Sequence, residues 1–137
     1  MSTQNVDVVR SAYAAFGRGD IAALLATLDP NVEWTTPGPD SLPYAGTRRG
    51  REAVGAFFAT LDSLFEFLAF EPHTFIADGD HVVVLGRDRL KVRATGEVIE
   101  EAWAHHLTVH GGKTVAFREY IDTAATVAAL RNAKAAV

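Results

Sequence analysis

The spacing of hydrophobic residues predicts three helices in the first half of the chain. Apolar side chains recur every three or four residues over three stretches, which is the pattern of amphipathic helices. The first stretch ends at Gly17, the second runs from Asp20 to Leu28, and the longest covers residues 51–68. Asp20 is suited to cap the second helix, and Asp29-Pro30 is suited to end it.

From about Phe70 the hydrophobic period changes to two, which is typical of β-strands. The predicted strands cover residues 70–77, 81–94, 98–109 and 113–122, after a first strand at 32–36, and a closing helix follows Thr123. Helices followed by an antiparallel meander form an α+β pattern. A long curled sheet with a helix across its open side would enclose a cavity.

The last hairpin, residues 101–122, turns at Gly111-Gly112 and carries the candidate site. A two-residue turn would place His105 opposite Arg118, whereas a three-residue loop with a glycine bulge would place it opposite Glu119. We predict the second register because it keeps one face apolar. The side chains on that face are then Trp103, His105, Leu107, Val109, Val115, Phe117, Glu119 and Ile121. The opposite face is small and mixed, and suits solvent or a partner sheet.

Composition and charge narrow the class of protein. The 137 residues are 48% hydrophobic and 22% charged, which is ordinary for one globular domain, residues 1–137. A net charge of −4 disfavours non-specific nucleic-acid binding, which requires basic patches. The absence of cysteine excludes disulfides and thiolate chemistry. We see no signal peptide and no apolar run of about 20 residues, so we expect a cytoplasmic protein without membrane contact.

His105 and Glu119 are the strongest candidates for chemistry. An imidazole beside a carboxylate in an apolar cavity suits general acid/base catalysis. Two structural alternatives are a satisfied polar pair in the core and a buried ion pair between Glu119 and Arg87. Arg87 shares a strand face with Arg89 and Lys91 and is expected at the polar end of the pocket.

Aromatic residues are the expected wall of the pocket, with plain core packing as the alternative. The candidate wall residues are Tyr13, Phe16, Trp34, Tyr44, Phe57, Trp103, Phe117 and Ile121. Tyr44 follows a loop with three prolines at residues 37–43, so it is expected at the pocket mouth. The adjacent His105 and His106 point to opposite faces of a strand, so we expect neither a metal site nor a cofactor.

Four segments together resemble one superfamily. They are the Gly19-Asp20 junction, the stretch Leu28-Asp-Pro-Asn-Val-Glu-Trp34, the approach from Gly46 to Gly50, and the end from Gly112 to Asp122. They resemble the SnoaL-like polyketide cyclase group of the NTF2-like superfamily, which also holds ketosteroid isomerases and limonene epoxide hydrolases. The resemblance implies a cone-shaped α+β barrel: three helices on a curved, mostly antiparallel sheet, a short C-terminal helix, one deep pocket, and usually a homodimer.

The catalytic residues of the ketosteroid isomerases do not carry over. The resemblance places their helix tyrosine at Ala12, their base at Trp34 and their oxyanion-hole acid at His105, so none of the three matches. Tyr13 is one residue away and is expected to face elsewhere on the helix.

The epoxide hydrolases and the polyketide cyclases match in part. The epoxide hydrolase arginine falls at Arg87 and its strand-end aspartate at Glu119, but its other aspartate falls at Arg89. In the cyclases an acidic residue on the last strands is the acid/base group, and Glu119 is its counterpart here.

The sequence therefore favours a cofactor-independent acid/base enzyme of isomerase, cyclase or hydrolase type on an apolar or polycyclic organic substrate. Glu119 would be the base, His105 its partner and Arg87 a charge stabiliser. The alternatives are a ligand-binding protein without turnover, and an interaction module with a collapsed pocket. We expect a homodimer through the outer sheet face.

Overall fold

A six-stranded sheet is the centre of the fold in the computed structural model, which describes residues 2–135. The strand order is β2-β1-β6-β5-β4-β3, and all neighbours are antiparallel except β1 and β6, which are parallel. The strands are β1 (Leu28–Thr36), β2 (Gly46–Arg49), β3 (Phe65–Asp78), β4 (His81–Val92), β5 (Val98–His110) and β6 (Lys113–Ile121).

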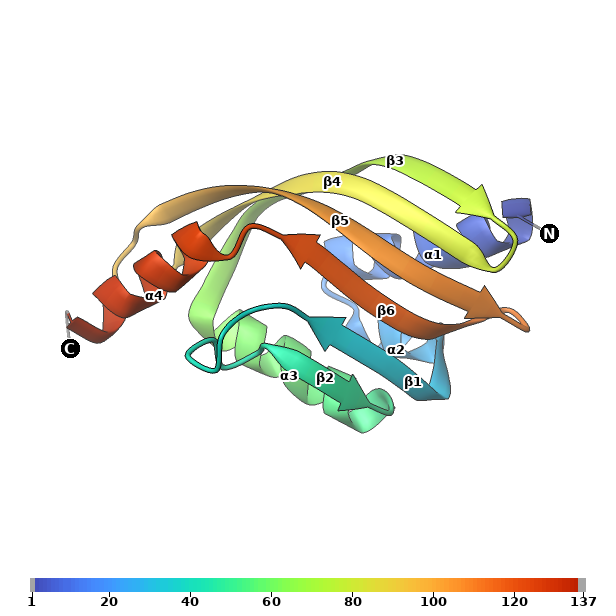
Figure 1. The fold of residues 1–137 in the computed structure, drawn as a ribbon, viewed down its shortest axis with the longest axis horizontal. Helices are drawn as coiled ribbons and strands as arrows, with labels where there is room; N and C mark the ends of the chain where they lie inside the picture. Colours follow the sequence, from blue (N-terminus) through green and yellow to red (C-terminus); the bar gives the residue numbers. More distant parts are fainter. Residues whose placement is uncertain (1, 136–137) are drawn as a thin grey trace.

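Helices lie against one side of this sheet and at its far end. They are α1 (Ser2–Gly17), α2 (Ile21–Ala26), α3 (Arg51–Leu64) and α4 (Ala124–Ala135). In Figure 1 the sheet arches over α1, α2 and α3, whereas α4 lies at the end away from the N-terminus. The Asp20 side chain caps α2 as predicted, since it accepts a hydrogen bond from the Ala23 N–H at 3.0 Å. The α+β class is confirmed.

The predicted third helix is too long at its C-terminal end. Helix α3 ends at Leu64 and β3 begins at Phe65, because the period-two pattern starts there and not five residues later. Phe65 is completely buried. Leu68, which the prediction placed on the apolar side of the helix, is 43% exposed where the pairing of β3 shifts between Phe67 and Ala69.

The sequence pattern also misses β2 and the first part of β1. The four residues of β2 include two arginines and no large apolar side chain, so they carry no hydrophobic period. Leu28, the predicted end of the second helix, instead begins β1 and is buried. A buried leucine fits a helix or a strand equally well, so periodicity alone could not place it.

The hairpin register is confirmed, but its origin differs from the prediction. The turn has two residues, Gly111 and Gly112, both with positive φ (59° and 78°), as a tight hairpin turn requires. Pairing then shifts between Thr108 and Val109, which leaves Val115 as the extra residue of a β-bulge. The bulge restores the pairing of His105 with Glu119. It also corrects one prediction, since the completely buried side chain in this part of β6 is that of Thr114 and not Val115.

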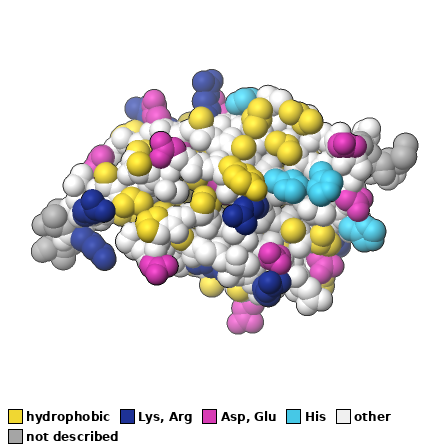
Figure 2. All heavy atoms as spheres, viewed as in Figure 1, with side chains coloured by type: hydrophobic (Ala, Val, Ile, Leu, Met, Phe, Trp, Pro, Cys, Tyr) yellow, Lys and Arg dark blue, Asp and Glu magenta, His cyan; other side chains and the backbone are white. Residues whose placement is uncertain are grey.

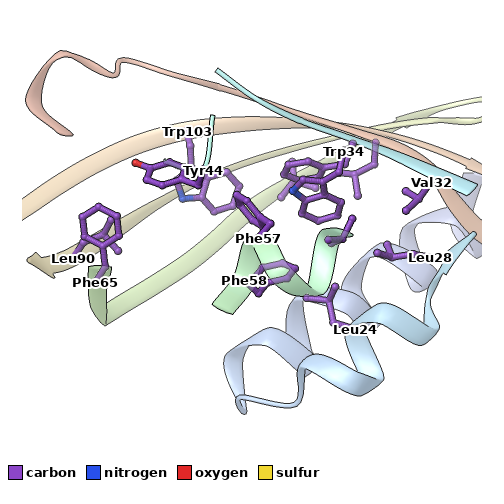
Figure 3. Packing of buried hydrophobic residues seen from close by; sticks show 14 of the residues in the cluster. Leu24, Leu28, Val32, Trp34, Tyr44, Phe57, Phe58, Phe65, Leu90 and Trp103 are labelled. Atoms are coloured by element: carbon purple, nitrogen blue, oxygen red, sulfur yellow. The ribbon is translucent and has the colours of Figure 1, made fainter. Parts of the chain in front are cut away.

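The core lies between the inner face of the sheet and the helices. Figure 3 shows Trp34 from β1 close to Phe57 and Phe58 from α3, with Leu24 and Leu28 on the helix side. Trp34 stacks on Phe117 of the neighbouring strand with ring centroids 3.8 Å apart. The parallel pairing of β1 with β6 therefore brings an aromatic cluster under the end of the sheet that holds Glu119.

In the described part of the chain, the helices leave the outer face of the sheet uncovered. Figure 2 shows the side on which β5 and β6 lie in front of α1 and α2, and histidine side chains lie there beside hydrophobic ones. Cross-strand pairing aligns Leu85, Ala104 and Tyr120 in one row, next to Val83 and His106 in another. No helix within residues 2–135 is long and apolar enough to cross a membrane.

Candidate functional site

A cavity of about 110 Å³ lies between the inner sheet face and the helices. Its wall is mainly aromatic and apolar, which is the usual lining of a small-molecule pocket. The aromatic residues that line it are Tyr13, Phe16, Trp34, Tyr44, Phe57, Phe58, Phe67, Phe70 and Phe117, and Ile121 adds to them. The sequence did not predict Phe58, Phe67 or Phe70, which lie on segments whose boundaries or faces were misplaced.

Tyr13, His105 and Glu119 form one hydrogen-bonded chain on the cavity wall. The Tyr13 hydroxyl lies 2.6 Å from Nδ1 of His105, and Nε2 of the same ring lies 2.9 Å from Oε2 of Glu119. His105 is 6% exposed, so its ring depends on these two partners rather than on water. With Glu119 ionised, Nε2 carries the proton and the Tyr13 hydroxyl donates to Nδ1.

Tyr13 is suited to be the donor in this chain. Burial, and then the charge of Glu119, raise the pKa of Tyr13 well above its usual range, so the phenol stays protonated. The Tyr13 side chain points towards His105 on the cavity wall, which corrects the prediction that Tyr13 faces elsewhere on the helix. The predicted counterpart, Ala12, lines the cavity too, because two neighbouring helix positions can both border a pocket when one carries a long side chain.

Trp103 lies behind His105 and holds the imidazole in place. The two rings stack with centroids 4.0 Å apart and planes 14° apart, and Phe70 stacks on Trp103 at 5.2 Å. Gly86 is paired with Trp103 across β4 and β5, and a Cβ atom on Gly86 would overlap the indole. A glycine inside a strand thus permits a close approach. Trp103, predicted as a wall residue, acts instead as the support of the wall.

A second polar group, which the sequence analysis did not predict, lines the same cavity. Asp88 and Glu101 face each other across β4 and β5, and the Thr126 hydroxyl of α4 donates to Oε2 of Glu101 at 2.6 Å. Burial, and then the charge of Glu101 and its hydrogen bond, raise the pKa of Asp88 from 3.8 to about 9, and Glu119 adds a smaller effect. Asp88 is therefore a neutral acid at pH 7.

Tyr44 completes this second group. Its ring is 9% exposed and lines the cavity, and burial followed by the charges of Glu101, Glu119 and Asp88 raises the pKa of the phenol well above its usual range. Its backbone carbonyl accepts hydrogen bonds from Thr36 and Arg48, which fixes the loop. Tyr44 lines the cavity and is buried, so its predicted place at the pocket mouth stays a prediction.

Arg87 does not reach the cavity, so its predicted position at the polar end of the pocket is wrong. Its side chain is 72% exposed on the outer face and pairs with Glu71 at 2.9 Å. Side chains alternate along β4, and the buried set is Val82, Val84, Leu90 and Val92. The inner position at this point of β4 is therefore that of Asp88, one residue further along the chain.

The cavity lining is acidic. Glu119, Asp88 and Glu101 line it, and none of the lining side chains within residues 2–135 is a lysine or an arginine. Within residues 2–135 no group of three or more His, Cys, Asp or Glu side chains is arranged to hold a metal ion. His106 lies on the outer face, where Nε2 contacts Nδ1 of His81 at 2.8 Å, and so it points away from His105 as the strand pattern predicts.

Comparison with known proteins connects this geometry to a family. Residues 9–117 match the family model described as SnoaL-like domain. An uncharacterised protein of Mycobacterium tuberculosis is 35% identical over 127 residues, which cover 89% of this chain and 92% of the relative.

Two solved structures share the fold over nearly the whole chain. An NTF2-like protein from Burkholderia xenovorans is 36% identical, with a TM-score of 0.82 and coverage of 97% of both chains. TerC, co-crystallised with polyporic acid, is 28% identical, with a TM-score of 0.83 and coverage of 90% of this chain and 95% of TerC. The fold is thus NTF2-like, as the resemblance implied.

Proposed function

We propose that this chain, which belongs to the SnoaL-like domain family, binds a small apolar organic molecule in its cavity and moves protons on it by acid/base catalysis. Glu119 is the proposed base. His105 is its proposed partner, and Tyr13 holds the imidazole. Proton transfer changes no oxidation state, so the proposed reaction needs no redox cofactor.

The observation that carries this proposal is the Tyr13–His105–Glu119 chain in an aromatic cavity. The Glu119 side chain is 20% exposed, so it combines contact with the cavity and a fixed hydrogen bond to His105. A carboxylate that takes a proton from a bound molecule loses its charge. The neighbouring Nε2–H of His105 stabilises the ionised form of Glu119, which exists before the proton is taken and again after it is returned. The Tyr13 hydroxyl in turn fixes which nitrogen of His105 carries the proton.

The cavity volume limits the size of the ligand. An apolar cavity of about 150 Å³ holds benzene, and the cavity here is about 110 Å³. The structure therefore favours a molecule of about one ring, and a polycyclic substrate would require the walls to separate. The co-crystallisation of TerC with polyporic acid supports an organic ligand for a protein of this fold.

Proton exchange at carbon tests the proposal. We expect the protein in D2O to speed the exchange of carbon-bound hydrogen for deuterium, followed by NMR, in at least one of cyclohex-2-enone, acetophenone and ethyl acetoacetate. Glu119→Gln should lower that rate at least tenfold, whereas Glu71→Gln, which changes an exposed glutamate, should not. Exchange at equal rates in wild type and Glu119→Gln would contradict the assigned role.

A ligand-binding protein without turnover is the second candidate. It is favoured by the imidazole of His105, which is buried and has both nitrogens occupied, and by the mismatch at Ala12 and Trp34. It predicts that Glu119→Gln binds the same molecules as the wild type and that no compound in the panel exchanges faster than in buffer.

We also propose that two copies of the chain pair through the outer sheet face. Leu85, Ala104 and Tyr120 form an aligned row there, and Tyr120 is 53% exposed. Ile76 on β3 is 54% exposed and is paired with Val83. The same face also carries Arg87, His106 and Arg118, so the surface that would meet a second sheet is mixed, with apolar residues beside charged ones.

A further inference from the structure

We propose that the indole N–H of Trp34 donates a hydrogen bond to an uncharged oxygen of the ligand, and that this bond sets which part of the ligand ring faces Glu119. The inference rests on the proposed function, because it concerns the ligand of the same cavity. It names the ligand class: a one-ring molecule that carries an ether, hydroxyl or ester oxygen away from the carbon that loses the proton.

Strand pairing places Trp34 on one side of Glu119 along the sheet. Trp34 on β1 is paired with Phe117 on β6, two residues before Glu119. Two residues of a strand separate the backbones of Phe117 and Glu119 by about 7 Å. Asp88 and Glu101 lie on the other side of Glu119, beyond the last residue of β6. The Trp34 end of the cavity is therefore distinct from the end with the two acids.

The indole nitrogen of Trp34 is the observation that points to a ligand. The side chain is 6% exposed and lines the cavity, yet no residue among 2–135 accepts a hydrogen bond from its Nε1. An indole N–H can only donate, and a buried donor without an acceptor is unfavourable. An oxygen atom of a ligand in this cavity would remove that cost.

The aromatic neighbours of Trp34 hold the indole but offer it no oxygen. It stacks on Phe117 with ring centroids 3.8 Å apart, and Phe57 and Phe58 lie at 6.0 and 5.6 Å. Figure 3 shows both phenylalanines of α3 beside the indole. Phe58 is inclined by 66° to the indole, so its π face is the competing acceptor for the N–H. Such a bond is weaker than one to oxygen.

Thr114 adds a second group of the same kind. It is completely buried and lines the cavity, and its hydroxyl oxygen has no partner among residues 2–135. Thr114 is the second residue of β6, so it lies on the same side of Glu119 as Trp34. A hydroxyl both donates and accepts. This end of the cavity therefore favours a ligand with an oxygen over a pure hydrocarbon.

Trp34 binds and orients the ligand without taking part in proton transfer. Its indole N–H is a donor and not an acid at neutral pH, so the oxygen it holds keeps its charge. The oxygen is expected to be neutral, because Glu101 and Glu119 line the cavity and would repel an anion. Trp34 is thus a residue that determines specificity.

The indole N–H signal of Trp34 tests the hydrogen bond directly. The chain has two tryptophans, hence two such signals in ¹H–¹⁵N NMR, and Trp34→Phe identifies one of them. We expect tetrahydropyran to move the Trp34 proton signal downfield, because a hydrogen bond to oxygen deshields it. Cyclohexane, the same ring with CH2 in place of oxygen, should not do so. Trp103 is absent from the cavity lining within residues 2–135, so its signal is the internal control.

The two affinities separate the hydrogen bond from the size of the ring. Both dissociation constants are measured by NMR titration. The Kd of tetrahydropyran relative to that of cyclohexane should rise about fivefold from wild type to Trp34→Phe, which keeps an aromatic wall but removes the donor. Phe57→Leu is the matched control, because it changes the wall without removing a polar atom. It should leave the ratio unaltered.

Three outcomes would overturn the role of Trp34. The first is the same affinity ratio in wild type and Trp34→Phe. The second is a wild-type Trp34 signal that does not respond to tetrahydropyran; Trp103→Phe assigns this signal if Trp34→Phe does not fold. The third is a Trp34 signal that already shifts in Thr114→Val without ligand, since the two groups would then bind each other.

The outcome for Trp34 is separable from that for Glu119. Deuterium exchange that depends on Glu119, with an affinity ratio unchanged in Trp34→Phe, would overturn this inference and leave the proposed function intact. Tetrahydropyran held by Trp34 in a protein that exchanges no compound of the panel would defeat the proposed function and support the hydrogen bond.

Discussion

At the scale of single residues, His105 connects the Tyr13 hydroxyl to the Glu119 carboxylate. Its ring is fixed by Trp103 from behind and by hydrogen bonds at both nitrogens. A change in the hydrogen bond of Tyr13 should therefore alter the hydrogen bond of Glu119, and the reverse, because both act on the same ring. Its tautomer is therefore the most informative local property of the site.

Replacing Tyr13 with phenylalanine should disturb that tautomer. In wild type, ¹⁵N NMR should show Nδ1 of His105 as an acceptor and Nε2 as the protonated nitrogen, because Tyr13 donates and Glu119 accepts. In Tyr13→Phe the Nδ1 signal should shift, with a loss of about 1 kcal/mol in the free energy of unfolding. Tyr120→Phe is the control. A wild-type ring protonated at Nδ1 and not at Nε2 would contradict the hydrogen-bond directions.

Asp88 should make stability depend on pH. Its pKa rises from 3.8 to about 9 on folding, so between these values the folded protein holds a proton that the unfolded chain releases. The contribution of Asp88 to stability is thus complete below pH 4 and is lost as pH rises towards 9. Glu101 and Glu119 act on the pKa of Asp88, and both residues are kept in a variant at position 88.

The comparison of wild type with Asp88→Asn isolates this contribution. Urea unfolding at pH 5 and pH 8.5 should show the variant gaining stability relative to wild type as pH rises. Two stability curves that remain parallel over this range would mean that Asp88 does not hold its proton in the folded state.

The sequence alone could predict some of the site residues, but not the directions in which their side chains point. The period-two pattern identified His105 and Glu119 as neighbours, because both lie on the apolar face of one hairpin. The same pattern on β4, where Val82, Val84 and Leu90 are apolar, could have assigned Asp88 to the inner face. The family resemblance gave priority to Arg87 instead. Tyr13 and Tyr44 were predicted only as walls, and the partner of the Tyr13 hydroxyl, His105, comes from a distant segment.

At the scale of elements, the packing of strand β4 against Trp103 requires a residue without a side chain at Gly86. Gly86→Ala would force its Cβ atom against the Trp103 ring and the Glu71 carbonyl. We expect a loss of about 1–3 kcal/mol in the free energy of unfolding and a changed tryptophan fluorescence. Gly17→Ala has no neighbour within 4 Å of its Cβ position and serves as the control. A Gly86→Ala protein as stable as wild type would refute this packing.

Helix α4 should be held at the cavity by one hydrogen bond. Thr126→Val keeps the side-chain shape but removes the donor to Glu101 at 2.6 Å. We expect a loss of about 1–2 kcal/mol in the free energy of unfolding and faster amide exchange in residues 124–135. Unchanged exchange in α4 would show that its apolar contacts alone fix it.

Element boundaries were predictable only where the chain carries a clear period. The strands at residues 81–92 and 98–110 lie within a residue or two of their predicted limits. Strand β2 has no such period, and it forms only because β1 offers it an edge. The β-bulge at Val115 is also invisible in the sequence, although the requirement for an unbroken apolar face predicted its consequence.

At the scale of the whole molecule, the two sheet faces serve different purposes in this account. The inner face encloses the acidic cavity, and the mixed outer face, on which Tyr120 is exposed, is the proposed contact with a second copy. Analytical ultracentrifugation should therefore give twice the chain mass of 14.8 kDa, and Tyr120→Asp should give the single-chain mass. A wild-type monomer at high micromolar concentration would contradict the proposed dimer without affecting the cavity.

A crystal structure of the protein with cyclohex-2-enone bound would show directly whether a ring occupies the cavity beside Glu119. We predict the ring inside the cavity, with a ring carbon in van der Waals contact with the Glu119 carboxylate and His105 still hydrogen-bonded to Glu119. A ring bound elsewhere, or a Glu119 side chain turned out of the cavity when the ring is present, would contradict the account.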